Sequence, residues 1–163
     1  MLARLFPGAR LYLKIGSRRL HGLNTGNSRQ FDEPPLLALE LRDRHKVVAA
    51  IGHAARQYEG RKDCRIINPF DHPRMLLGDF STAEALLRQV VKALQPGLLQ
   101  PTLVLHPLER LEGGLSDMEI RAFHELGLGC GARQVRLWTG RELLPDEVRE
   151  LAFPLDQGEL LNP

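Results

Sequence analysis

The second half of the sequence alternates short apolar runs with amphipathic segments, and this pattern constrains the fold more than any other feature. Residues 102–105 and 134–138 are apolar runs typical of buried strands, and a helix is predicted to follow Ser116. Before them, apolar residues recur at helical spacing along one face: Ala83, Leu86, Leu87, Val90, Val91 and Leu94. Alternating strands and helices predict an α/β fold, in which a mixed sheet with parallel crossovers has helices packed on its faces.

Three helix starts carry recognisable capping signals. Ser81 followed by Glu84 has the spacing of a capping box, and so does Ser116 followed by Glu119. Pro145 is followed by two acidic residues, which is typical of a first helical turn. We therefore expect Ser81 and Ser116 to be the N-cap residues of two helices, with a third helix beginning near Pro145.

The first third of the chain predicts strands rather than helices. Residues 11–15 and the run from Leu20 read as two strands joined by a tight turn at Gly16-Ser17. Further strands are predicted over residues 36–41 and 47–51, and we expect the first of these to pair in the same sheet as the hairpin. A short helix over residues 53–58 and a short strand over residues 65–67 complete the prediction.

Composition excludes several classes of protein. A chain of 163 residues is long enough for one domain, and its net charge of +2 does not predict nucleic acid binding. The two cysteines and six histidines show no ligand spacing, so we expect no metal site and reduced thiols. No apolar run is long enough to cross a bilayer, and we expect a cytoplasmic protein. Residues 1–6 have the pattern of a short amphipathic anchor that could contact a membrane surface.

The turn of the first hairpin is the candidate site. Glycine allows close backbone approach and a hydroxyl adds a donor, so such a turn can present N–H groups to a phosphate. An acidic residue just before the turn would be expected to hold Mg²⁺, but that position is Lys14, which can contact a phosphate and cannot coordinate a metal while charged. The anion-binding candidates are Lys14, Gly16, Ser17, Arg18 and Arg19.

From Leu11 to about Leu151 the chain resembles the N-terminal half of the bacterial actin-like rod shape-determining proteins, MreB and its relatives. The matching strings, in order, are Leu11 to Gly26, Glu33-Pro34, Val48 to Gln57, Gly60-Arg61, Ile67-Asn68-Pro69, Gly78-Asp79-Phe80 and Gly131 to Val135. The resemblance implies half of an actin/Hsp70-type, ribonuclease H-like ATPase fold. It divides the chain into an N-terminal segment (1–10), one MreB domain I-like domain (11–152) and a C-terminal tail (153–163).

The resemblance also implies how the site differs from that of an active ATPase. The family pattern has aspartate where this chain has Lys14 and a hydroxyl residue where it has Leu20. Glu119 falls at the glutamate that helps position the hydrolytic water, although its place in the predicted capping box gives it a structural role as well. An acidic Glu-Glu-Pro string is replaced by Thr139-Gly140-Arg141. The family's second half, with its second phosphate loop and adenosine-binding segment, has no counterpart in the sequence, so we expect a degenerate site without a bound cofactor.

Two functions follow from these expectations. The first is a non-enzymatic, single-half actin-like protein that acts as an interaction or regulatory module, with a rod-shape cytoskeletal protein or a second copy of itself as partner. The alternative is a nucleotide-binding ATPase that uses ATP and Mg²⁺ in a cleft completed by oligomerisation or by a partner chain. In the first case the protein would be cytoplasmic and peripheral to the inner membrane. The apolar residues 151–155 and 160–161, at the C-terminal end, would cover part of an exposed face or form a homodimer.

Overall fold

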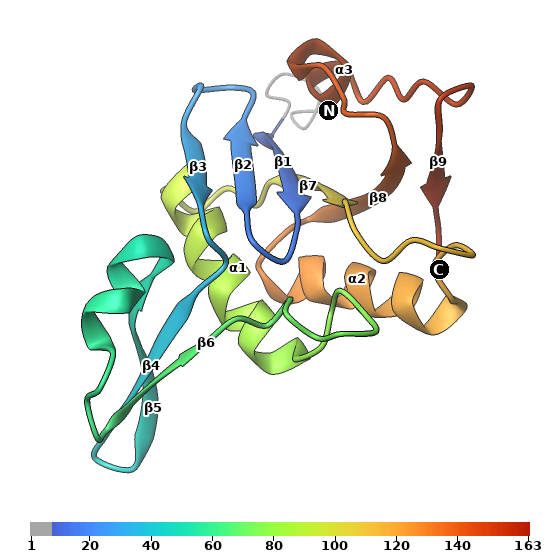
Figure 1. The fold of residues 1–163 in the computed structure, drawn as a ribbon. Helices are drawn as coiled ribbons and strands as arrows, with labels where there is room; N and C mark the ends of the chain where they lie inside the picture. The colour runs from blue at the N-terminus through green and yellow to red at the C-terminus, as the bar shows by residue number, and fades with distance from the viewer. Residues whose placement is uncertain (1–7) are drawn as a thin grey trace.

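The computed structural model describes residues 8–163, and its centre is a mixed six-stranded sheet (Figure 1). In sheet order the strands are β3 (Gln30–Glu33), β2 (Leu20–Asn24), β1 (Arg10–Ile15), β7 (Thr102–Pro107), β8 (Gln134–Gly140) and β9 (Gly158–Leu161). β3 pairs antiparallel with β2, β2 with β1, and β9 with β8, whereas β7 pairs parallel with both β1 and β8. The predicted mixed sheet with parallel crossovers is confirmed.

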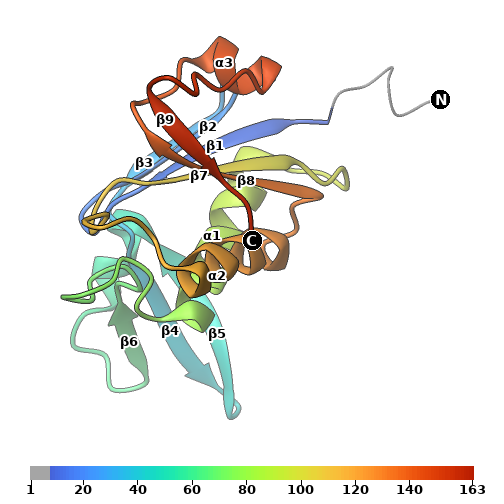
Figure 2. The same cartoon turned by 90° about the vertical axis from the view of Figure 1, so that its right-hand side faces the viewer.

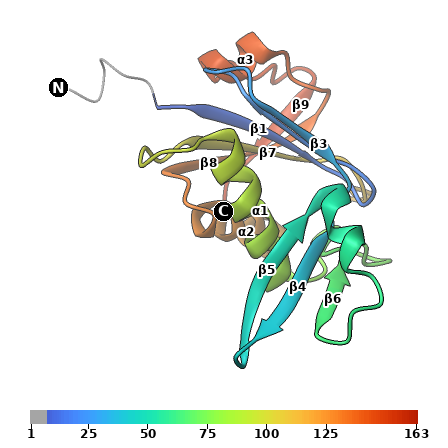
Figure 3. The same cartoon turned by 90° about the vertical axis from the view of Figure 1, so that its left-hand side faces the viewer.

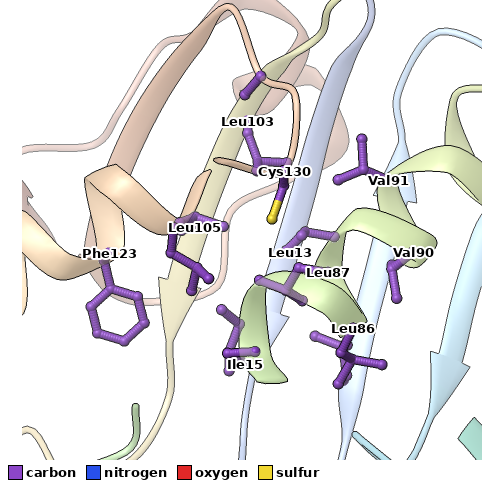
Figure 4. Packing of buried hydrophobic residues seen from close by; sticks show 14 of the residues in the cluster. Leu13, Ile15, Leu86, Leu87, Val90, Val91, Leu103, Leu105, Phe123 and Cys130 are labelled. Carbon is purple, nitrogen blue, oxygen red and sulfur yellow. The ribbon is translucent and has the colours of Figure 1, made fainter. Parts of the chain in front are cut away.

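Helices cover both faces of this sheet (Figure 2). On one face lie α1 (Phe80–Leu94) and α2 (Asp117–Gly129), and on the other lies the short α3 (Pro145–Glu150). Figure 4 shows the packing on the first face, where Leu13 and Ile15 of β1 lie beside Leu87 of α1, and Phe123 of α2 lies on the side of Leu105 of β7. The periodicity of residues 83–94 is therefore explained, because all six predicted apolar positions are buried in this cluster.

A second, smaller sheet stands beside the lower end of α1 (Figure 3). It contains β4 (Leu37–Arg42) between β5 (His45–Ile51) and β6 (Cys64–Ile67), with a 3₁₀ helix over Gly52–Tyr58. The expectation that the 36–41 strand shares a sheet with the hairpin is wrong. Pro34 and Pro35 follow β3 directly, and because proline has no N–H to donate, the first sheet cannot continue through them and the chain starts a new one.

The capping box at the start of α2 is confirmed, and the one predicted for α1 is wrong. Ser116 and Glu119 exchange side-chain and backbone hydrogen bonds as expected. At α1 the N-cap is Asp79, whose carboxylate accepts hydrogen bonds from the Thr82 backbone N–H (3.1 Å) and hydroxyl (2.7 Å). Ser81 lies inside the first turn. Asp and Ser are both favoured N-cap residues, so α1 could have been expected to begin after either Asp79 or Ser81, which are two residues apart.

Asp79→Ala should destabilise the protein by about 1 kcal/mol, because it removes the acceptor for the Thr82 N–H in the first turn of α1. Ser81→Ala should change the free energy of unfolding by no more than a few tenths of a kcal/mol. Urea unfolding of the two variants beside the parent measures both values. Equal losses would contradict the assignment of Asp79 as the cap.

The structure describes the C-terminal end of the chain and leaves residues 1–7 undescribed. At the C-terminal end, residues 158–161 of the expected tail form β9, an edge strand of the main sheet. The predicted membrane anchor over residues 1–6, within the 1–10 segment, lies outside the described residues. Between residues 8 and 163 no helix is long and apolar enough to cross a membrane.

Candidate functional site

The predicted hairpin forms, and its turn is tightly closed. The Gly16 N–H donates to the Arg19 carbonyl (3.0 Å), and the Asn68 side-chain amide donates to the Ser17 carbonyl (2.7 Å). A Cβ at Gly16 would lie 3.1 Å from a Glu109 carboxylate oxygen and 3.3 Å from the Arg19 carbonyl oxygen. Glycine therefore suits this position because the turn leaves little room for a side chain.

Lys14, at the end of β1, is held in an ion pair. Its side chain is only 13% exposed, and its ammonium group donates to the carboxylate of Glu142, in the loop after β8. This hydrogen bond holds the pKa of Glu142 below its usual range. The same ammonium lies 5.9 Å from the centre of the Tyr12 ring. The resemblance predicts a metal-binding carboxylate at this position. The chain has Lys14 there instead, and its ammonium group is already paired with Glu142.

A buried polar network lies next to this ion pair and was not predicted from the sequence. His106 Nε2 is 3.0 Å from the Gly140 carbonyl, which can only accept, so Nε2 carries the proton and Nδ1 is an acceptor. The Tyr12 hydroxyl donates to Nδ1 (2.6 Å) and accepts from the Leu143 N–H (3.1 Å). Burial raises the pKa of Tyr12 to about 12 and lowers the pKa of His106, so both side chains are neutral at pH 7.

The arginines of the turn lie in a hollow of about 310 Å³ between the hairpin and the 3₁₀ helix. Arg19 makes a bidentate ion pair with Asp32 on β3 (2.6 and 2.7 Å), which lowers the pKa of Asp32. Arg18 is exposed and lines the hollow together with His53 and Arg56. Lys14 is not among the lining residues. The five predicted anion-binding residues therefore do not form a single site.

Glu119 is also separate from the hairpin. Its carboxylate accepts from the N–H (2.8 Å) and the hydroxyl (2.9 Å) of Ser116. It lines an apolar groove of about 500 Å³ with Phe80 and Met118, and none of the hairpin candidates lines that groove. The hydrogen bonds of the capping box account for Glu119 at this position without a catalytic role.

Metal ligands are not gathered anywhere in the described part of the chain. Between residues 8 and 163 no group of three or more His, Cys, Asp or Glu side chains could hold a metal ion. The hairpin provides a cation at the end of β1 and a second positive group, Arg18, on the side facing the small sheet. At this turn the ammonium group of Lys14 is ion-paired, and the guanidinium group of Arg18 is exposed.

The strand order, the parallel crossovers and the separate small sheet define an actin-like α/β fold, and solved structures of actin-like filament proteins share it. MreB5 of Spiroplasma citri bound to AMPPNP superposes with a TM-score of 0.55 at 19% sequence identity, over 78% of this chain and 38% of that one. The same protein bound to ADP gives a TM-score of 0.58 at 19% identity, over 78% and 37%. The MamK double helical filament gives 0.57 at 15% identity, over 78% and 40%.

The comparison confirms the fold that the resemblance implied. The chain spans about two fifths of the length of these neighbours, as expected for one half of an actin-like protein. No protein-family model matches the sequence, and no curated protein sequence matches it significantly. At identities below 20% the likeness establishes the fold, and the function has to be argued from the site.

Proposed function

We propose that this chain is a non-enzymatic, single-half actin-like module related to the bacterial cell-shape cytoskeleton, with a degenerate nucleotide site. The observation that carries the proposal is the ion pair between Lys14 and Glu142. In the pattern that the chain resembles, this end of β1 supplies an acid for Mg²⁺. Here an ammonium group would repel the metal, and the Glu142 carboxylate beside it is already neutralised by the ion pair.

Two further features support loss of the enzyme chemistry. Glu119 is occupied by the helix cap, and it shares no cavity with the hairpin. Both arginines of the turn are exposed, but Arg19 is held by Asp32, so Arg18 is the one that the described ion pairs leave available to a phosphate. A site that binds a nucleotide tightly encloses most of the ligand and directs several polar groups toward it. This turn does neither.

The proposed partner is a rod-shape cytoskeletal protein or a second copy of this chain. MamK, which shares the fold, assembles into a double helical filament. Light scattering after size exclusion tests self-association, and co-sedimentation with a polymerised rod-shape protein tests the filament contact. A stable monomer that stays in the supernatant would contradict this part of the proposal.

Titration calorimetry with Mg-ATP should show no saturable heat, and phosphate release should stay at background. A nucleotide-binding actin-like filament protein serves as the positive control. The alternative function, an ATPase completed by oligomerisation or a partner chain, predicts the opposite: binding that disappears in Lys14→Ala and hydrolysis that disappears in Glu119→Ala. That pair of results would overturn the non-enzymatic proposal.

We also propose that residues 1–6 bring the protein to the inner membrane surface. Leu2, Leu5 and Phe6 would supply apolar contact and Arg4 would attract anionic headgroups. Flotation with liposomes containing anionic lipid should recover the full chain with the vesicles, and a chain lacking residues 1–6 should remain at the bottom of the gradient. Equal recovery of both would rule out this anchor.

A further inference from the structure

The small sheet carries the positive charge of the molecule. Residues 37–67 contain seven Lys and Arg against four Asp and Glu, so their net charge is +3. Since the whole chain carries +2, all other residues together carry −1. The seven basic residues are Arg42, Arg44, Lys46, Arg56, Arg61, Lys62 and Arg65. A charge asymmetry of this kind marks a surface that attracts an acidic partner.

One face of the small sheet also holds an apolar groove of about 220 Å³. Its apolar lining comes from Leu39 and Leu41 on β4 and Ile67 on β6. Leu41, near the end of β4, is 56% exposed, so part of this apolar lining is open to solvent. The groove therefore offers apolar surface that neither the main sheet nor α1 covers completely.

Basic side chains lie around this apolar floor. In the strand register Lys46 of β5 is opposite Leu41, and Arg65 of β6 is opposite Leu39. Residues opposite each other on neighbouring strands share one face, so each cation lies beside a leucine. Lys62, in the loop before β6, also lines the groove.

The acids of the groove do not cancel this charge. Glu40 is bound by Arg42 (2.5 Å), so its carboxylate is neutralised within β4. Asp63 is the other acidic residue that lines the groove, whereas three cations line it: Lys46, Lys62 and Arg65. The groove thus combines an apolar floor with an excess of positive charge at its rim.

We propose that this groove docks a segment of a protein partner in which leucine or a similar apolar residue is flanked by glutamate or aspartate. The apolar residue would occupy the floor at Leu41 and the acids would meet Lys46 and Lys62. The groove has no aromatic side chain on which a base could stack, which favours a peptide over a nucleic acid. The inference rests on the proposed function as an interaction module, and it names the chemistry of the partner.

The test uses a fluorescein-labelled peptide of alternating glutamate and leucine as the probe, with the full chain and fluorescence anisotropy as the readout. We expect saturable binding. The double variant Lys46→Glu with Lys62→Glu should weaken it at least tenfold, and so should Leu41→Asp. The matched control Arg121→Glu reverses an equally exposed charge on α2 and should leave binding unchanged. Thermal melts verify that each variant is folded.

Several results would overturn the inference. These are absence of saturable binding, equal binding of a glutamate–glycine peptide or of a single-stranded DNA oligonucleotide, and loss of self-association in the double variant, which would make this surface a contact between copies. Nucleotide binding is measured in a separate assay. A failed peptide titration would therefore reject the groove while the non-enzymatic proposal stands or falls on calorimetry.

Discussion

Gly158→Ala is expected to destabilise the protein by about 2–3 kcal/mol, because β9 can pass over Trp138 only where it has no side chain. A Cβ at residue 158 would lie 2.3 and 2.4 Å from two ring atoms of Trp138 and 2.5 Å from the Thr139 carbonyl oxygen. The indole cannot move aside easily. It is completely buried, its N–H donates to the Arg141 carbonyl (2.8 Å), and its ring packs against Phe153.

Urea unfolding of the variant and the parent measures this loss. Gly8→Ala is the matched control, since a Cβ there would approach no atom closer than 3.5 Å. In a Trp138→Leu background the cost of Gly158→Ala should shrink, because the clash is with the ring. A loss in Gly158→Ala no larger than in the control would show that β9 does not pack as described.

Undocking of β9 would also expose the edge of β8, so the variant should associate more readily at high concentration.

The same region shows which parts of the fold local sequence can predict. The hairpin, α2 and the strands β7 and β8 follow from periodicity, turn residues and one capping box, all of which act over a few residues. β9 has only four residues and begins with the glycine that the Trp138 ring requires, so its sequence carries no strand pattern. The pairing of β4 was predicted incorrectly for a related reason. Periodicity predicts that a strand exists and does not specify which strand it pairs with.

The candidate site was predictable only in part. Lys14, Gly16 and Ser17 stand at recognisable turn positions, and their departure from the family pattern is visible in the sequence. The partner of Lys14 is not, because Glu142 lies 128 residues away and reaches it only through the parallel order of β1, β7 and β8. Arg19, just before β2, meets Asp32 of β3 because β2 and β3 are antiparallel neighbours. Electrostatic partners therefore emerged only once the sheet order was known.

A second large effect is expected at the buried network between β1 and β7. Tyr12→Phe should destabilise the protein by about 3 kcal/mol, because it leaves two buried groups, His106 Nδ1 and the Leu143 N–H, without their partner. The ring itself is retained, so packing changes little. Urea unfolding at pH 7.5 measures the effect. Tyr58→Phe, at the end of the 3₁₀ helix beside the small sheet, provides the control and should be close to neutral.

The network should also make stability depend on pH. Burial lowers the pKa of His106 in the folded state, while the unfolded chain regains an ordinary pKa of about 6.5. The unfolded state therefore binds a proton first, and the stabilising contribution is present above pH 6.5 and lost as the pH falls below it. The free energy of unfolding should decline between pH 7.5 and 5.5, with a slope of at most about 1.4 kcal/mol per pH unit from this one group.

His106→Gln should flatten this decline, and His45→Gln, at an exposed position, should leave it unchanged. The lowered pKa values of Asp32, Glu142 and Glu147 affect stability only at lower pH, below the ordinary range of carboxyl groups, so the two windows separate. A parent protein whose stability is constant from pH 7.5 to 5.5 would contradict the neutral, hydrogen-bonded His106. A decline that His106→Gln removes would show that His106 is the group whose protonation destabilises the folded state, as its buried hydrogen bonds with Tyr12 and Gly140 require.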